Sequence, residues 1–251
     1  MISIKNEHEL EAMREACKIT AAARALAGKM VRPGVSTKAI DQAVHDYIVS
    51  QGAKPSFLNY SGYPASACIS VNSTVIHGIP GHYILKDGDI VSVDVGAYYK
   101  GFHGDCGATY ACGSISTEAQ KLIDVTRQSF FEGIKKAVAG NHLFDISNAI
   151  ADYVEPFGYG IVEELVGHGI GHALHEDPQI PNFRQKRKGI RLMPGMTLAI
   201  EPMINIGRPD VEWLDDDRTV VTEDGSLSAH YENTILINEE GEPDILTLGH
   251  V

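Results

Sequence analysis

The sequence lacks the long apolar run that a membrane span or a secretory leader requires. No segment has the roughly 20 consecutive apolar residues of a transmembrane helix, and the first ten residues, MISIKNEHEL, contain no signal-peptide core. Cysteine is also scarce: the four cysteines form no C-x-x-C pair and are too few for a disulfide scaffold. These absences predict a cytoplasmic protein with reduced thiols and no membrane attachment.

Positive charge is in short supply as well. The 251 residues include 21 lysines and arginines against 33 aspartates and glutamates, which gives a formal net charge of −12. A nucleic-acid-binding protein normally presents a basic surface, and this chain offers only one short basic run, RQKRKGIR at residues 184–191. We interpret this run as a solvated loop and predict no specificity for nucleic acid.

The sequence does contain a repeated order of secondary structure. Helical periodicity marks four segments, residues 6–30, 37–51, 117–139 and 145–154. Residues 66–112 and 161–237 are rich in β-branched residues and glycine, which is typical of strands and turns. A shift of 106 residues aligns the second helix with the fourth. Amphipathic helices can match by chance, but the repeated order favours two related halves. Because no Ser/Pro/Gly-rich linker separates them, we predict an α+β fold with a single domain over residues 1–251.

Two aspartates interrupt the first strand region, in DVGAYYKGFHGD at residues 94–105. A carboxylate buried in a sheet is unfavourable unless something positive meets it. If residues 89–97 and 102–110 form a hairpin that turns at Tyr99–Lys100, Asp94 lies directly opposite Asp105. A three-residue loop closed by Gly101 would break this parity. Solvated strand ends would explain one aspartate, but a facing pair favours a bound cation.

Two glutamates and a histidine extend this acidic set. Glu201 in TLAIEPMI and Glu232 in SAHYENTILI stand in apolar, strand-like runs, where a carboxylate needs a partner. Arg208 or Arg218 could pair with one such glutamate. His168 lies in the glycine-rich stretch VGHGIGHALHEDP. Two Asp, two Glu and one His suit two divalent ions such as Mn, Co, Fe(II) or Zn. Such a pair can hold a hydroxide and polarise a carbonyl, which predicts a hydrolase.

These residues, in this order, resemble the five metal ligands of the methionine aminopeptidase family, in particular its short bacterial type (type I). The motifs that carry the resemblance are YSGYPASACISVNSTVIHGIP, LKDGDIVSVDVG, GFHGD, GHGIGHALHEDP, LMPGMTLAIEPM and SLSAHYENTILI, and it extends from the first helix nearly to Val251. The resemblance implies the pita-bread fold, a curved antiparallel sheet with outer helices and pseudo-twofold symmetry. It also implies metal-dependent removal of the initiator methionine from nascent proteins.

The resemblance implies a role for each ligand. Asp94 would chelate one metal, Asp105 and Glu232 would bridge both, and His168 and Glu201 would hold the other. Glu201 would also act as general base for a metal-bridging water or hydroxide. His230, close to Glu232, and His172 both stand where family members can have glutamine, and the resemblance makes neither of them a ligand.

The resemblance also implies the residues that bind the substrate. His175 would bond the scissile carbonyl and stabilise the tetrahedral intermediate, and His77 would contact the amide nitrogen beyond the cleaved bond. The methionine pocket would include Tyr60, Tyr63 and Cys68, together with three positions that depart from the common family residues, Phe57, Leu174 and Arg218. The next substrate residue would have to be small. A peripheral monovalent-cation site would use Asn72, Thr74 and Ser228.

Arg218 is the departure with the most consequence, because a charge replaces the usual tryptophan. We expect its side chain to point to solvent or to pair with Asp215, Asp216 or Asp217. As partners we expect the N-termini of nascent polypeptides and a transient ribosome contact, with the protein itself a monomer.

Two other functions remain open at this point. One is a pita-bread peptidase that cleaves before proline, although the chain lacks the additional N-terminal domain usual in those enzymes. The other is a non-catalytic pita-bread protein that binds partners, and such proteins typically lose ligands that this sequence retains.

Overall fold

The computed structural model describes residues 2–248 of the chain. Its helices are α1 (Glu7–Met30), α2 (Thr37–Ser50), α3 (Thr117–Ile134) and α4 (Leu143–Val154), with 3₁₀ turns η1 (Tyr60–Gly62) and η2 (Glu155–Phe157). Within the described range, no helix has both the length and the apolar character needed to cross a bilayer. Helices therefore occur at all four predicted places.

The first two helices begin at side chains that cap them. The Asn6 side chain accepts the backbone N–H of Glu9 at 3.1 Å, and the Glu9 carboxylate accepts that of Asn6 at 2.9 Å. This reciprocal pair is a capping box. The Ser36 hydroxyl accepts the backbone N–H of Ala39 at 3.1 Å at the start of α2.

The fourth helix starts two residues earlier than predicted. It begins at Leu143, and Asp145 lies within its first turn rather than before it. The Asp145 carboxylate reaches back to accept the backbone N–H of His142 at 2.8 Å. An acid in the third helical position gives the same sequence signal as an acid that precedes the helix, which explains the difference.

The third helix ends five residues before the predicted Ala139. Its last helical residue is Ile134, and the preceding Gly133 weakens the final turn because glycine loses much conformational freedom in a helix. The carbonyl of Lys136 then accepts the side-chain amide of Asn141 at 3.0 Å instead of continuing the helical ladder.

All strand pairs in the described residues are antiparallel. The strands are β1 (Lys54–Pro55), β2 (Ala67–Val71), β3 (Thr74–Ile76), β4 (Ile90–Tyr99), β5 (Phe102–Ala111), β6 (Gly160–Ile161), β7 (Gly167–Gly169), β8 (Glu176–Ile180), β9 (Thr197–Ile200), β10 (Met203–Asn205), β11 (Val211–Trp213), β12 (Val220–Thr222), β13 (Ser228–His230), β14 (Asn233–Leu236) and β15 (Asp244–Ile245). One sheet pairs β4 with β1, β2 and β5, and another has the order β15-β14-β9-β7-β8. The strands β4 and β5 form the longest hairpin.

The register of this hairpin corrects the sequence prediction. Asp94 pairs with Gly107 and Asp105 pairs with Gly96, so the two aspartates are diagonal neighbours and not directly opposite. The turn lies at Lys100–Gly101, where both residues have positive φ, +48° and +89°, as a two-residue hairpin turn of this kind requires. Because the register moved by an even number of residues, both carboxylates remain on one face of the sheet.

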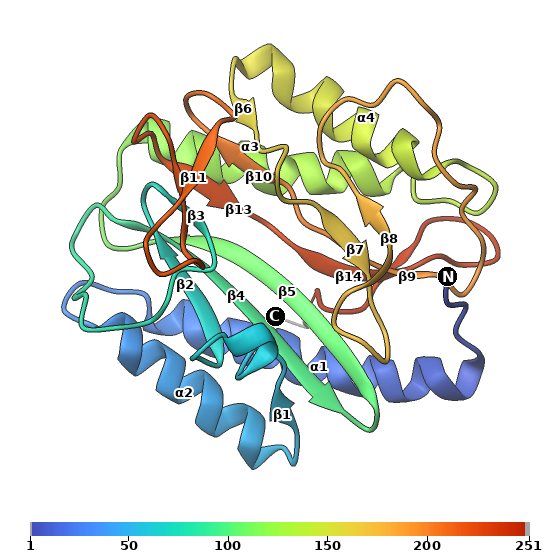
Figure 1. Ribbon diagram of the computed structural model, residues 1–251, viewed down its shortest axis with the longest axis horizontal. Helices are drawn as coiled ribbons and strands as arrows, with labels where there is room; N and C mark the ends of the chain where they lie inside the picture. Colours follow the sequence, from blue (N-terminus) through green and yellow to red (C-terminus); the bar gives the residue numbers. More distant parts are fainter. Residues whose placement is uncertain (1, 249–251) are drawn as a thin grey trace.

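The helices cover the strands from two sides. In Figure 1, α1 and α2 lie along one side of the strands and α3 and α4 along the other. One buried core packs α3 and α4 against the strands, with Phe130, Ile146 and Ile150 among its members, and a second packs α1 and α2 against β2 and β4, with Ile40 and Val93 among them. Each half of the chain thus contributes a helix pair that buries one face of its own strands.

The helix ends support the internal repeat. Gly52, which follows α2, has φ +72°, and Gly158, which follows α4 and η2, has φ +75°. These are the glycines that the shift of 106 residues aligns. Only glycine adopts this left-handed conformation without a steric penalty, so both halves end their helical segment with the same backbone device.

Candidate metal centre

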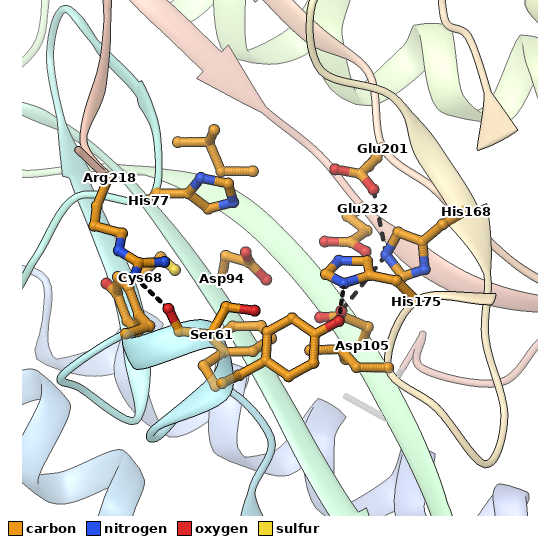
Figure 2. Close-up of a pocket in the computed structure, with 15 residues that line it drawn as sticks. Ser61, Cys68, His77, Asp94, Asp105, His168, His175, Glu201, Arg218 and Glu232 are labelled. Carbon is orange, nitrogen blue, oxygen red and sulfur yellow. Dashed lines mark hydrogen bonds and ion pairs between the residues drawn. The ribbon is translucent and has the colours of Figure 1, made fainter. Parts of the chain in front are cut away.

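The five residues predicted to bind metal come from distant parts of the chain and line one pocket (Figure 2). Asp94 lies on β4, Asp105 on β5 and His168 on β7, while Glu201 follows β9 directly and Glu232 lies between β13 and β14. None of the five is more than 7% exposed. Strands from both halves therefore bury four carboxylates and one imidazole together.

Backbone hydrogen bonds join the two halves at Gly107. This residue pairs with Asp94 across the β4–β5 hairpin, and it exchanges two hydrogen bonds with the backbone of Glu232, at 3.2 and 2.9 Å. The buried Arg24 of α1 donates to the carbonyl oxygens of Gly107 and Glu232, at 3.4 and 3.2 Å. Glu232 is thus fixed next to Asp94 by main-chain contacts rather than by its own side chain.

The side chains of the centre present lone pairs to one another. His168 Nε2 lies 3.5 Å from Glu201 Oε1 and 3.9 Å from Asp105 Oδ2. Its Nδ1 lies 2.8 Å from the carbonyl oxygen of Gly169, which places the ring proton on Nδ1 and leaves Nε2 as an acceptor. Buried Oδ1 atoms of Asp94 and Asp105 find no hydrogen-bond partner among residues 2–248. Orphaned buried acceptors of this kind fit a divalent metal ion, and these residues would hold it.

The arginines considered as partners for the glutamates lie elsewhere. Arg208 pairs with Glu223 at 3.3 Å. Arg218 donates from Nη2 to the carbonyl oxygen of Ser61 (Figure 2), and its backbone N–H donates to Asp216 at 2.9 Å. The expectation that the Arg218 side chain points to solvent or pairs with an adjacent aspartate is therefore wrong. Its guanidinium instead lines the pocket and reaches the backbone carbonyl of Ser61.

Burial controls the charge of the centre. Desolvation raises the pKa of Asp94 to about 7. Desolvation, reinforced by the neighbouring negative charges, raises the pKa of Asp105, Glu201 and Glu232 well above the ordinary values. Burial lowers the pKa of His168 to about 3, so its imidazole is neutral, the form that binds metals. A cation must displace protons from these acids, so its binding strengthens as the pH rises through 7.

One wall of the pocket is apolar. Phe57, Tyr63, Cys68 and Leu174 line it, and all are at most 8% exposed and belong to one hydrophobic cluster. The Tyr63 hydroxyl donates to the carbonyl oxygen of Gly78 at 2.9 Å, which satisfies its polar end. Burial raises the pKa of the Cys68 thiol and keeps it neutral. This wall suits an apolar side chain of the substrate.

Two histidines outside the predicted ligand set flank the carboxylates. His175 Nδ1 lies 2.7 Å from the hydroxyl of Tyr60, and its ring packs edge-on against His168 with centroids 4.3 Å apart. His77 follows β3 with φ +59°, a conformation that is uncommon for residues other than glycine. Burial lowers the pKa of His77 to about 4, so it is neutral near pH 7.

Two residues that line the pocket, Ser61 and Ile76, were not predicted. His230, which was expected near the site but not as a ligand, turns Nε2 toward Glu232, 3.7 Å from Oε2. A signal for His230 existed in the sequence, because a residue two positions before Glu232 lies on the same face of an extended chain. Nothing comparable in the sequence marks Ser61, which enters the pocket through a turn with φ +46°.

The three residues predicted to bind a monovalent cation lie close together. The carbonyl of Asn72 accepts the backbone N–H of Ser228 at 3.0 Å, and Thr74 opens β3 two residues later. The Asn72 side chain is already engaged, since it donates to Asp89 at 2.9 Å and accepts from the backbone of Ile90 at 3.0 Å. Backbone carbonyl oxygens are the remaining donors for a cation, and the site stays a prediction.

Comparison with known proteins adds to this geometry. The sequence profile of metallopeptidase family M24 matches residues 11–239, which is most of the chain. The chain belongs to metallopeptidase family M24. Its buried carboxylates and histidine thus stand in a family of metal-dependent peptidases, which confirms the prediction of a hydrolase.

Members of the M24 family resemble this chain to different degrees. It is 54% identical over 248 residues to the methionine aminopeptidase of Clostridium perfringens, with 99% of both chains covered. The crystal structure of the Thermotoga maritima methionine aminopeptidase matches with a TM-score of 0.96 and 43% identity, over 98% of this chain and 99% of that one. The Xaa-Pro dipeptidase of Bacillus anthracis gives a TM-score of 0.80 and 26% identity, over 98% of this chain and 62% of that one. These matches confirm the pita-bread fold.

Proposed function

We propose that this M24 peptidase removes the N-terminal methionine from nascent polypeptides whose second residue is small. It would act in the cytoplasm as a single catalytic domain and as a monomer. The observation that carries the proposal is the placement of four buried carboxylates and His168 beside an apolar pocket. The 54% identity to a methionine aminopeptidase supports methionine as the residue removed.

The similarity to methionine aminopeptidases supports a role for each ligand. We assign Asp94 to one cation, His168 and Glu201 to the other, and Asp105 and Glu232 to both. Two divalent ions such as Mn, Co, Fe(II) or Zn, when bound, would polarise the scissile carbonyl and acidify a water shared between them. One monovalent cation near Asn72, Thr74 and Ser228 completes the proposed set of ions.

Glu201 is the proposed general base. Its carboxylate follows β9 and is 7% exposed, and burial raises its pKa well above the ordinary value for glutamate. A carboxylate with a raised pKa can take a proton from the attacking water and then release it to the leaving amine. In a single turnover, Glu201 would therefore accept one proton from the water and donate it to the leaving amine.

Two neutral histidines would contact the peptide bond. When the Tyr60 hydroxyl donates to His175 Nδ1, the proton of the ring is on Nε2, which can donate to the carbonyl oxygen as it gains negative charge. His77 would contact the amide nitrogen beyond the cleaved bond. The methionine side chain would lie against Phe57, Tyr63 and the other apolar residues of the wall.

Metal removal tests the function directly. A chelator should abolish hydrolysis of Met-Ala-Ser, and Mn, Co, Fe(II) or Zn should restore it, because the bound cations would polarise the carbonyl and acidify the attacking water. Ala-Pro-Phe should stay intact throughout. Less metal should be bound at pH 6 than at pH 8, since the pKa of Asp94 is about 7 in the metal-free protein.

The control for this experiment is the folded state of the stripped protein, measured by circular dichroism. Folded protein that hydrolyses Met-Ala-Ser with none of the metals would refute the proposed function. Hydrolysis of Ala-Pro-Phe in preference to Met-Ala-Ser would show that the protein is a proline-specific peptidase.

Arg218 gives a test of the pocket. Replacing it with tryptophan should change the ratio of kcat/KM for Met-Ala-Ser over Leu-Ala-Ser by about fivefold or more, because a flat apolar ring would replace a guanidinium in the wall. The Kd for Co(II) should stay within about twofold, as Arg218 bonds Ser61 and no carboxylate of the centre.

The matched control is Arg208→Trp, because Arg208 pairs with Glu223 and does not line the pocket. It should leave the selectivity ratio unchanged. If Arg218→Trp also leaves the ratio unchanged, Arg218 has no part in recognising the first residue.

The basic run 184–191 is the proposed site of a transient ribosome contact. Arg184 at its start is paired with Asp152 at 2.6 Å and Glu155 at 2.7 Å. Lys186, Arg187 and Lys188 are exposed, and we propose that they supply the charge for ribosomal RNA or for an acidic protein surface.

A further inference from the structure

His230 enters the metal centre from β13, two residues before Glu232. It ends β13, and the whole residue is 1% exposed. Its Nε2 is buried and has no hydrogen-bond partner among the described residues. A buried imidazole nitrogen without a partner needs an explanation.

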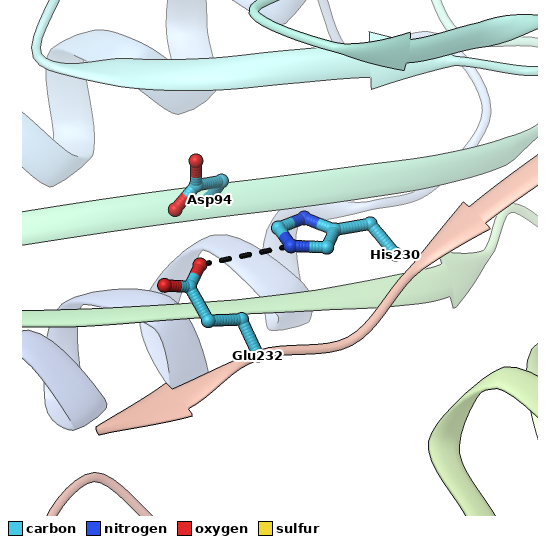
Figure 3. A group of neighbouring side chains, drawn as sticks. All are labelled: Asp94, His230 and Glu232. Carbon is cyan, nitrogen blue, oxygen red and sulfur yellow. Dashed lines mark ion pairs between the residues drawn. The ribbon is translucent and has the colours of Figure 1, made fainter. Parts of the chain in front are cut away.

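The surroundings of His230 Nε2 are carboxylate oxygens. It lies 3.7 Å from Glu232 Oε2 and 4.0 Å from Glu201 Oε2. Figure 3 shows the ring directed at the Glu232 carboxylate, with Asp94 beside it. Ligand atoms of Asp94, His230 and Glu232 all lie within 4.8 Å of one another. These separations are too long for hydrogen bonds. The ligand atoms nevertheless surround one common space.

His168 supplies an internal standard for these distances. Its Nε2 lies 3.5 Å from Glu201 and 3.9 Å from Asp105, and the ligand atoms of Asp105, His168 and Glu232 also lie within 4.8 Å of one another. The distances from His230 Nε2 to its neighbouring carboxylates are therefore similar to those from His168 Nε2 to its own. The two triads share Glu232, and each contains one aspartate and one histidine.

The backbone around His230 is arranged to hold the ring in place. Its N–H and its carbonyl both bond the Thr109 hydroxyl, at 2.9 Å each. Across the sheet, Gly107 makes room for the ring, because a Cβ there would lie 2.7 Å from His230 Cε1 and 2.9 Å from Nδ1. A side chain larger than glycine at residue 107 would displace the imidazole from the carboxylates.

We propose that His230 is a direct nitrogen ligand of the cation held by Asp94 and Glu232. Each of the two cations then has one imidazole, instead of one imidazole serving the pair. This inference rests on the two-cation site of the proposed function. A second nitrogen donor shifts the preference of the Asp94 site away from Mn and toward Co, Fe(II) and Zn, which bind imidazole well.

The test counts coordinated imidazoles in the full-length protein. Metal-free enzyme is loaded with two equivalents of Co(II), and proton NMR records the paramagnetically shifted, solvent-exchangeable ring N–H signals. Each histidine bound to Co(II) contributes one such signal. We expect two signals for the wild type and one for His230→Gln, which keeps a polar side chain but has no imidazole. We also expect the Kd of one Co(II) to rise about 10- to 100-fold.

The matched control is His45→Gln. His45 bonds Ser66 through Nδ1 at 2.9 Å and does not line the pocket, so this variant should keep both signals and the wild-type Kd values. His230→Ala provides a second variant if glutamine prevents folding. One signal in the wild type, or two in a folded His230 variant, would overturn the proposal.

These outcomes separate the ligand proposal from the proposed function. Hydrolysis of Met-Ala-Ser is measured on the same samples. Wild-type protein that cleaves the peptide but gives one imidazole signal retains the function and refutes the ligand. Protein that gives two signals, one of them lost in His230→Gln, but never cleaves the peptide retains the ligand and refutes the function.

Discussion

Replacing Asp94 with asparagine should abolish metal-dependent hydrolysis of Met-Ala-Ser, with kcat/KM falling by more than about 100-fold. The substitution removes a charge that a cation needs but keeps the shape of the side chain. Asp94 has a buried, unpartnered Oδ1 and a pKa of about 7 in the metal-free protein. A neutral amide therefore replaces a side chain that is largely protonated below pH 7, and the fold should be retained.

The measurements are steady-state kinetics at saturating metal and thermal unfolding of the metal-free proteins. Asp46→Asn is the matched control, because Asp46 is exposed on α2, where it accepts from Gln42 at 2.8 Å. It should leave both measurements unchanged. Wild-type activity in Asp94→Asn would remove Asp94 from the ligand set, and loss of folding would show that its role in the sheet is structural.

Replacing His175 with alanine should lower kcat by about 10²- to 10³-fold, the usual effect of removing one donor to a developing oxyanion. The Kd for Co(II) should change little, since the ring contacts His168 only edge-on. The hydroxyl of Tyr60 holds His175 Nδ1 at 2.7 Å, so Tyr60→Phe should lower kcat by a smaller factor, about tenfold.

The comparison of kcat, KM and metal affinity identifies the role of His175. A fall in kcat with KM and Kd unchanged is the mark of a contact made in the transition state. A rise in the Kd for Co(II) equal to the loss of activity would mean that His175 acts by supporting the metal site. A larger effect for Tyr60→Phe than for His175→Ala would exclude the proposed order of donors.

The two aspartates show how far sequence reasoning reaches. Alternation along a strand predicts that Asp94 and Asp105 share a face, and they do, although the register differs by two residues. The position of the turn depended on whether Lys100 accepts a positive φ beside Gly101. Residue type decides this weakly, because a lysine in that conformation is tolerated only where the hairpin twist requires it. A register shift of two residues keeps each side chain on the same face of the sheet. The prediction that both aspartates share one site is therefore unaffected by the shift.

Contacts between a side chain and backbone atoms far along the chain could not be predicted from the sequence. Arg218 bonds the carbonyl of Ser61, 157 residues away, and no pattern of charges near Arg218 indicates this. The local aspartates were the reasonable partners, but the fold brings the Ser61 carbonyl within reach of the guanidinium. His230 differs, since its spacing from Glu232 was visible in the sequence, while the space left for its ring by Gly107 was not.

The shared use of Glu232 has a consequence for the order in which the protein matures. Both triads include this residue, so neither is complete while a ribosome has yet to add residue 232. The β4–β5 hairpin, by contrast, is synthesised more than a hundred residues earlier, so Asp94 and Asp105 wait for their partner carboxylate. Metal acquisition is therefore a late event in biogenesis, and it locks the first-made half of the chain to the last-made strands.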